Sequence, residues 1–168
     1  MNQVRAVNAY GDRQQAAPPY GSGKVRKITP AFVCRALNGD PIEVYGDGQQ
    51  ISDMVWIHDL AVTLVEALEQ AEQGNIFEHV LECAPREHRT VLEVAELVRD
   101  YAAEITGETV DIIHLPMRPG EIPGDKVTGD PDTITKVGLT EPATPVEEGL
   151  RRTVRWFHEN RHHWHTPN

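Results

Sequence analysis

The sequence predicts an α/β fold, because strand-like and helix-like segments alternate along its 168 residues. Short runs rich in small and branched residues are typical of strands, and longer runs with apolar residues every three or four positions are typical of helices. The hydrophobic fraction of 39% and the charged fraction of 25% lie in the range of globular proteins. We therefore expect a folded domain with a real core.

The first half of the chain contains three expected strands and two expected helices. The strands cover about residues 3–8, 42–45 and 53–57, with a Pro- and Gly-rich loop at 16–23 and a turn at 46–48. One helix follows Pro30 and stops at Asn38-Gly39. The second covers about 59–72, where an apolar stripe is formed by Leu60, Ala61, Leu64, Ala67, Leu68 and Ala71.

The second half repeats the alternation. A strand is expected at 77–83, and a helix after it, because Thr90 and Glu93 have the spacing of a capping box and Gly107 closes the apolar stripe. A strand at 111–115 precedes an irregular segment at 116–129. Pro145 is expected to begin a last helix that runs to about 160, with Thr144 as its cap.

Charge and cysteine content narrow the classes of partner. A net charge of −10 repels nucleic acid, although a few local Arg or Lys side chains can still bind a small anion. Cys34 and Cys83 lack metal-ligand spacing, so we expect reduced thiols. No apolar run approaches the roughly 20 residues that span a bilayer, and no signal peptide is evident. We expect a cytoplasmic protein without nucleic-acid or membrane partners.

Four stretches occur in a specific order: Arg5-Ala6-Val7-Asn8-Ala9-Tyr10-Gly11, Tyr45-Gly46-Asp47-Gly48-Gln49-Gln50, Met117-Arg118-Pro119-Gly120-Glu121 and Pro145-Val146-Glu147-Glu148-Gly149-Leu150. In this order they resemble the C-terminal part of NAD-dependent nucleotide-sugar epimerases and dehydratases, which belong to the extended short-chain dehydrogenase/reductase family. The resemblance covers nearly the whole chain. It implies partial Rossmann-type sheet elements plus a small α/β substrate-binding domain, lacking the N-terminal dinucleotide-binding half.

The resemblance also implies which functions lie within this chain and which lie in an N-terminal half. Residues 1–160 would form the substrate-binding portion, followed by a His-rich tail at 161–168. Members of the family use NAD, a glycine-rich loop and a Tyr-x-x-x-Lys pair for hydride and proton transfer. We expect this chain to lack both the glycine-rich loop and the Tyr-x-x-x-Lys pair, and assign no catalytic residue. NAD is therefore not expected to bind this chain alone, and an N-terminal half is expected as a separate chain or as a lost segment.

Five residues are candidates for substrate binding on the strength of the resemblance: Asn8, Lys27, Glu43, Tyr45 and Arg118. Arg118 is the foremost, because a guanidinium can hold phosphate oxygens with two parallel hydrogen bonds. Each has a plainer alternative: Asn8 caps a turn, Lys27 and Arg118 are solvated loop side chains, and Glu43 and Tyr45 are ordinary strand residues. Asp130 resembles the residue that begins the family's last short helix, a structural role.

Ser52 departs from the family's pattern, which has an arginine at that position as the second half of a phosphate clamp. Its hydroxyl brings no charge, so affinity for a diphosphate could fall by roughly 1.5 to 3 kcal/mol, unless Arg13 or Arg26 compensates. His162, His163 and His165 lack a fixed carboxylate partner, so no metal site is expected. A non-catalytic nucleotide-sugar-binding or subunit-assembly module, including a homo-oligomer, is the alternative function.

Overall fold

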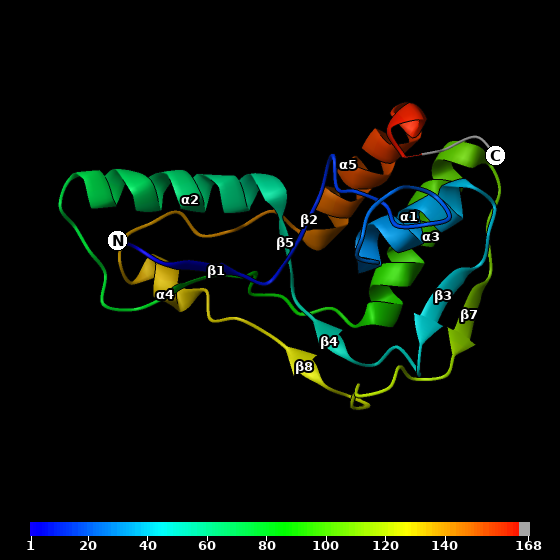
Figure 1. The fold of residues 1–168 in the computed structure, drawn as a ribbon, viewed down its shortest axis with the longest axis horizontal. Coiled ribbons are helices and arrows are strands. Elements are labelled where there is room, and N and C mark those ends of the chain that lie inside the picture. Colours follow the sequence, from blue (N-terminus) through cyan, green and yellow to red (C-terminus); the bar gives the residue numbers. More distant parts are fainter. Residues whose placement is uncertain (165–168) are drawn as a thin grey trace. The chain divides into compact units, whose positions relative to one another are not determined.

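The computed structural model describes residues 1–164, which divide into two compact units. Unit 1 comprises residues 1–10, 51–89 and 126–146, and unit 2 comprises 11–50, 90–125 and the described residues from 147 onward. All four strand pairs are parallel. Helices and parallel strands alternate along the chain (Figure 1), which confirms the α/β prediction.

Unit 1 contains three two-stranded pairs. Strand β1 (Val4–Ala6) pairs with β6 (Leu81–Cys83), β2 (Asn8–Tyr10) with β5 (Met54–Trp56), and β4 (Ile51–Ser52) with β8 (Lys126–Val127). The expected strand at 3–8 is thus two strands. The N–H of Val7 donates to Cys83 and the N–H of Asn8 donates to Asp53, so the chain changes partners at this point.

Several element boundaries in unit 1 differ from the prediction. The expected strand at 77–83 pairs only over Leu81–Cys83, because its partner β1 is three residues long. The strand expected at 53–57 is β5, which ends at Trp56, where helix α2 (Ile57–Glu72) begins two residues early. Helix α4 (Asp132–Thr135) begins where Asp130 accepts a hydrogen bond from the N–H of Asp132, which fits the structural role expected of Asp130.

Half of the apolar stripe expected on α2 is exposed within this chain, namely Ala61, Leu64 and Leu68. Ala67 is buried, and Leu60 packs against the core. Thr63 and Ala67 are the buried positions of the helix. Val62, Leu64, Val65 and Leu68 expose between 45% and 59% of their surface. The core of unit 1 instead consists of Val55, Ala67, Leu81, Cys83, Ile134 and Leu139. Most of the apolar face of α2 therefore remains available for another contact.

Unit 2 has one strand pair and a helical layer. Strands β3 (Ile42–Tyr45) and β7 (Ile112–Leu115) lie side by side, next to helices α1 (Ile28–Leu37) and α3 (Val91–Thr106) (Figure 1). Helix α5 (Val146–Glu159) and the short 3-10 helix η1 (Arg161–His163) follow. Thr90 and Glu93 form the predicted capping box, and Gly107 closes α3 in the left-handed conformation.

The segment expected as a His-rich tail is described as far as Trp164, and His165 lies outside the described residues. Trp164 is only 3% exposed, and its indole N–H donates to the Phe157 carbonyl at 2.7 Å. The start of this segment is therefore packed against α5. Within residues 1–164, no helix has both the length and the apolar character to cross a membrane.

Candidate functional site

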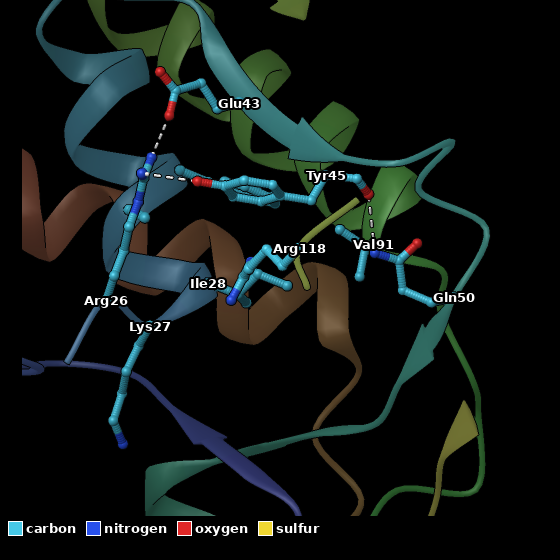
Figure 2. A pocket seen from close by; sticks show the side chains of 10 residues that line it. Arg26, Lys27, Ile28, Glu43, Tyr45, Gln50, Val91 and Arg118 are labelled. Carbon is cyan, nitrogen blue, oxygen red and sulfur yellow. Dashed lines mark hydrogen bonds and ion pairs between the residues drawn. The ribbon is translucent and has the colours of Figure 1, made fainter. Parts of the chain in front are cut away.

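A pocket in unit 2 gathers four of the five predicted substrate-binding residues (Figure 2). It holds about 370 Å³ of space, part of which is open solvent. Three basic side chains and one acidic side chain contribute to its wall, so its local charge is opposite to that of the chain. The lining residues are Arg26, Lys27, Ile28, Ala31, Phe32, Glu43, Tyr45, Gln50, Val91 and Arg118.

Strand register explains why Tyr45 and Arg118 meet. Tyr45 is the last residue of β3 and stands opposite Leu115, the last residue of β7. Parallel strands place their carboxyl ends at the same edge, so the segments that leave them start side by side. The N–H of Gly46 donates to the Leu115 carbonyl at 2.8 Å, which extends the pairing into the turn. Arg118 follows three residues after β7 and so returns to Tyr45.

Gly46 allows the Arg118 segment to approach closely. Gly46 has a φ of +70°, a left-handed backbone conformation that favours glycine. A Cβ at this position would lie 2.4 Å from the Met117 methyl carbon. The turn that begins at Gly46 also contacts the first residues of helix α3. The N–H of Val91 donates to the Gln50 carbonyl, and the N–H of Leu92 donates to the Gly48 carbonyl. The turn thus connects β3, which carries Tyr45, to helix α3, which carries Val91, and both residues line the pocket.

The guanidinium of Arg118 lies over the ring of Tyr45, with its central carbon 4.3 Å from the ring centroid. Such a cation–π contact orients the charged plane without consuming its N–H donors. The Nε of Arg118 lies 3.4 Å from a carboxylate oxygen of Glu121, and about half of the side chain is exposed. Arg118 is therefore oriented yet accessible, which suits a side chain that binds an anion.

Arg26 approaches Tyr45 from another direction (Figure 2). It donates to the Tyr45 hydroxyl at 3.3 Å and forms an ion pair with Glu43. Glu43 also pairs with Arg35, which additionally donates to the Pro41 carbonyl at 3.1 Å. One carboxylate is therefore shared by two guanidinium groups.

Lys27 lies at the start of α1 and lines the pocket, but Figure 2 shows its ammonium group on the side away from Glu43 and Tyr45. It is the N-cap residue of α1, and its side chain makes no capping hydrogen bond. The first turn of α1 contains no acidic residue. The positive end of the helix dipole and the lysine charge both favour an anion near this wall.

Asn8 belongs to unit 1, where its amide donates to the Ser52 hydroxyl at 2.6 Å and to the Asp53 carbonyl at 3.2 Å. These contacts join β2 to Ser52 at the end of β4 and to Asp53 before β5. They are long-range structural contacts and not the turn cap of the plainer interpretation, and the role of Asn8 toward a substrate stays a prediction.

The spacing Tyr-x-x-x-Lys does occur once by count, as Tyr20 to Lys24, so the expectation that it is missing needs correction. Both residues lie in a loop rather than on a helix. The Tyr20 hydroxyl donates to Asp40 at 2.6 Å, and burial, followed by this hydrogen bond, raises the pKa of Tyr20 above its usual value. A catalytic tyrosine base needs a lowered pKa, which is the opposite of the direction at Tyr20.

Arg26 and Gln50 line the pocket but were not among the predicted site residues. Gln50 donates from its amide to the Tyr45 carbonyl at 3.2 Å and so holds the turn. Its place in the Tyr45–Gln50 stretch was the signal that could have identified it. Arg26 stands outside any recognised stretch, next to Lys27. Arg13, the other arginine considered, is not a lining residue.

Within the described part of the chain, no three His, Cys, Asp or Glu side chains gather as metal ligands. Cys34 and Cys83 are free and buried. Burial raises the pKa of the Cys34 thiol to about 12, so the thiol stays protonated near neutral pH. Neither cysteine lines the pocket.

Comparisons with known proteins agree on one family. The model of the NAD dependent epimerase/dehydratase family matches residues 3–81. A UDP-N-acetyl-alpha-D-glucosaminuronate decarboxylase of Bacillus cytotoxicus is 27% identical over 93% of this chain and 46% of its own length. UDP-glucuronic acid decarboxylase 1 of Danio rerio is 31% identical over 95% of this chain and 34% of its own length.

A solved structure gives the same result. The UDP-glucose 4-epimerase of Thermotoga maritima, crystallised with UDP-glucose, matches with a TM-score of 0.73 and 28% identity. The match covers 93% of this chain and 45% of the epimerase chain. The chain thus spans less than half the length of these relatives. From its motifs, its fold and these matches, the chain is similar to a part of the NAD-dependent epimerases/dehydratases, with the family model matching its residues 3–81.

Proposed function

We propose that the pocket in unit 2 binds a nucleotide sugar, and that the chain is the substrate-binding part of an NAD-dependent epimerase or dehydratase. The observation that carries this proposal is Arg118, oriented on the Tyr45 ring and exposed beside two other cations, Arg26 and Lys27. A diphosphate presents paired anionic oxygens that a guanidinium matches with two hydrogen bonds. The names of the relatives supply the nucleotide-sugar class.

Within this proposal each residue has a task. Arg118 holds the diphosphate, and Lys27 adds charge near the start of α1. Tyr45 orients Arg118 and, with Glu43, lies on the strand whose backbone would contact the nucleobase. Asn8 stays a candidate for substrate binding on the strength of its motif alone. The free cysteine thiols fit the reducing conditions of the cytoplasm.

Hydride transfer requires NAD and a catalytic base in addition to this substrate pocket. NAD supplies the chemistry of removing hydride from a sugar carbon and returning it. In the proposed arrangement the dinucleotide-binding βαβ unit and the tyrosine base come from an N-terminal half, encoded in the same or a separate chain. The exposed apolar residues of α2 offer a surface that such a half could cover.

Isothermal titration calorimetry with UDP-glucose tests the binding proposal. We expect Arg118→Ala to weaken binding by about 10-fold or more, because a hydrogen bond between charged groups contributes about 1.5 to 3 kcal/mol. Arg151→Ala is the matched control. Arg151 also lies 4.3 Å over a tyrosine ring, that of Tyr101, and pairs with Glu104, yet it is not a lining residue. Equal affinities of wild type and Arg118→Ala would refute the proposal.

A turnover assay tests the need for another half. We expect the 168-residue chain, mixed with NAD and a panel of nucleotide sugars, to give no product. Product formation in the absence of any other protein would overturn this part of the proposal.

The second candidate function is a non-catalytic binding or subunit-assembly module. The exposed apolar face of α2 favours it, because contiguous apolar surface commonly marks an interface. Absence of UDP-glucose binding together with tight self-association would favour an assembly role. Binding that depends on Arg118 favours the substrate-binding role.

A further inference from the structure

We propose that Arg26 is a second diphosphate-binding guanidinium of this pocket, held ready by Glu43 and released when the ligand arrives. The inference rests on the proposed function. It adds a specific residue that no recognised sequence stretch contains. It also identifies Glu43 as the group that balances the charge of Arg26 when no anion is bound.

The first argument is position. Arg26 and Arg118 both lie beside Tyr45, with their central carbons 6.0 Å and 4.3 Å from the ring centroid. Arg26 also donates to the Tyr45 hydroxyl at 3.3 Å, at the far end of the same side chain. Figure 2 shows the Arg26 side chain reaching up to Glu43 and Tyr45, whereas Lys27 extends away from them. Two guanidinium groups thus flank one aromatic side chain.

The second argument is the sharing of Glu43. Its carboxylate pairs with Arg26 through one oxygen and with Arg35 through the other. The Arg35 side chain is 16% exposed, and it is anchored further by the Pro41 carbonyl. The Arg26 side chain is 42% exposed. Arg26 is therefore the partner that can leave, and Glu43 keeps Arg35 as a mostly buried counter-ion when it does.

The third argument is charge. The pocket is lined by three cations, Arg26, Lys27 and Arg118, and by one carboxylate, that of Glu43, which leaves a surplus of positive charge. The Arg26 side chain is 42% exposed, so a phosphate can reach it from solvent. Exchanging the carboxylate of Glu43 for a phosphate then replaces one charge-assisted hydrogen bond of Arg26 by another. A diphosphate, with two anionic groups, can engage Arg118 and Arg26 together. A neutral ligand would leave this surplus unmatched.

Calorimetric titration of the chain with UDP-glucose tests the proposal through four variants. We expect Arg26→Ala to weaken binding by about 10-fold or more, and Arg26→Lys to weaken it less, because lysine keeps the charge but not the paired donors. Glu43→Gln should strengthen binding several-fold by releasing Arg26. In the double variant Arg26→Ala/Glu43→Gln this gain should disappear.

Arg151→Ala again serves as the control, and a thermal melt of each variant verifies folding. If Arg26→Ala binds UDP-glucose as the wild type does, the inference is wrong. It is also wrong if the gain from Glu43→Gln persists without Arg26, because the effect is then general repulsion by the carboxylate.

The outcomes separate the two proposals. Weaker binding in Arg118→Ala with unchanged binding in Arg26→Ala removes the inference and keeps the proposed function. Unchanged binding in both variants removes both. Weaker binding in Arg26→Ala alone supports the second guanidinium and contradicts the role given to Arg118.

Discussion

Tyr45 connects the residues of the candidate site, since Arg118, Arg26 and Gln50 all contact it. Sequence reasoning found Tyr45 and Arg118 because each lies in a recognisable stretch near the end of a strand. It did not assign Arg26 to the site, because the loop before α1 has no periodicity that orients a side chain. Asn8 was predicted from its motif alone, and its side chain donates hydrogen bonds to Ser52 and Asp53.

Glu82 gives a pH-dependent prediction at the scale of a residue. The hydrogen bond from the Asp130 N–H, followed by one from Arg5, lowers the pKa of Glu82 below its usual 4.5. Folding therefore favours the carboxylate, and this stability is complete above pH 4.5 and is lost as pH falls through the lowered folded value. We expect Glu82→Gln to lower the free energy of unfolding by about 1 to 3 kcal/mol at neutral pH.

Urea unfolding at several pH values measures this effect. The difference between wild type and Glu82→Gln should shrink as the solution is acidified below pH 4.5. Glu78→Gln is the control, because Glu78 is an exposed glutamate of the same unit. A difference that stays constant at all pH values would contradict the assigned role.

At the scale of elements, β3 was predicted with its observed bounds, Ile42–Tyr45. The capping box of α3 was also predicted, because both features depend on local sequence signals. The strands of unit 1 were predicted too long. Their lengths depend on partners far away in sequence, such as the three residues of β1 opposite β6. Local patterns do not contain that information.

Gly46→Ala tests the turn between β3 and α3. The left-handed backbone costs alanine about 1 kcal/mol, and the new methyl must displace Met117, the neighbour of Arg118. We expect lower stability in urea unfolding and weaker UDP-glucose binding in calorimetry.

Gly39→Ala separates the loss of stability from the loss of UDP-glucose affinity that we expect of Gly46→Ala. Gly39 has a similar φ, +79°, and a Cβ there has no heavy atom within 4 Å. The Gly39→Ala variant should lose stability without losing affinity for UDP-glucose. If Gly46→Ala binds as tightly as Gly39→Ala does, the turn does not position Arg118.

At the scale of the whole molecule, the chain consists of two units, and the candidate pocket is built within unit 2. The alternation of elements predicted the α/β class, and the family resemblance predicted the partial Rossmann-type sheet. The exposure of α2 was not predicted, because an amphipathic pattern shows that a face is apolar and does not show what covers it.

Leu64→Lys and Leu68→Lys test whether that face is an interface. Both side chains are at least half exposed, so we expect the free energy of unfolding to change by no more than about 0.5 kcal/mol. Self-association in sedimentation velocity should decrease, because the new charges oppose burial. Glu69→Lys, a charge change on the same helix, should leave association unchanged. Equal association of wild type and both leucine variants would contradict an interface role.

The most direct measurement of the central claim is a titration of the labelled chain with UDP-glucose, followed by NMR of the arginine Nε–Hε groups. The account predicts that the signals of Arg118 and Arg26 shift together with the amides of β3, while the signal of Arg151 stays in place. Shifts confined to residues outside the pocket, or none at saturating ligand, would contradict it.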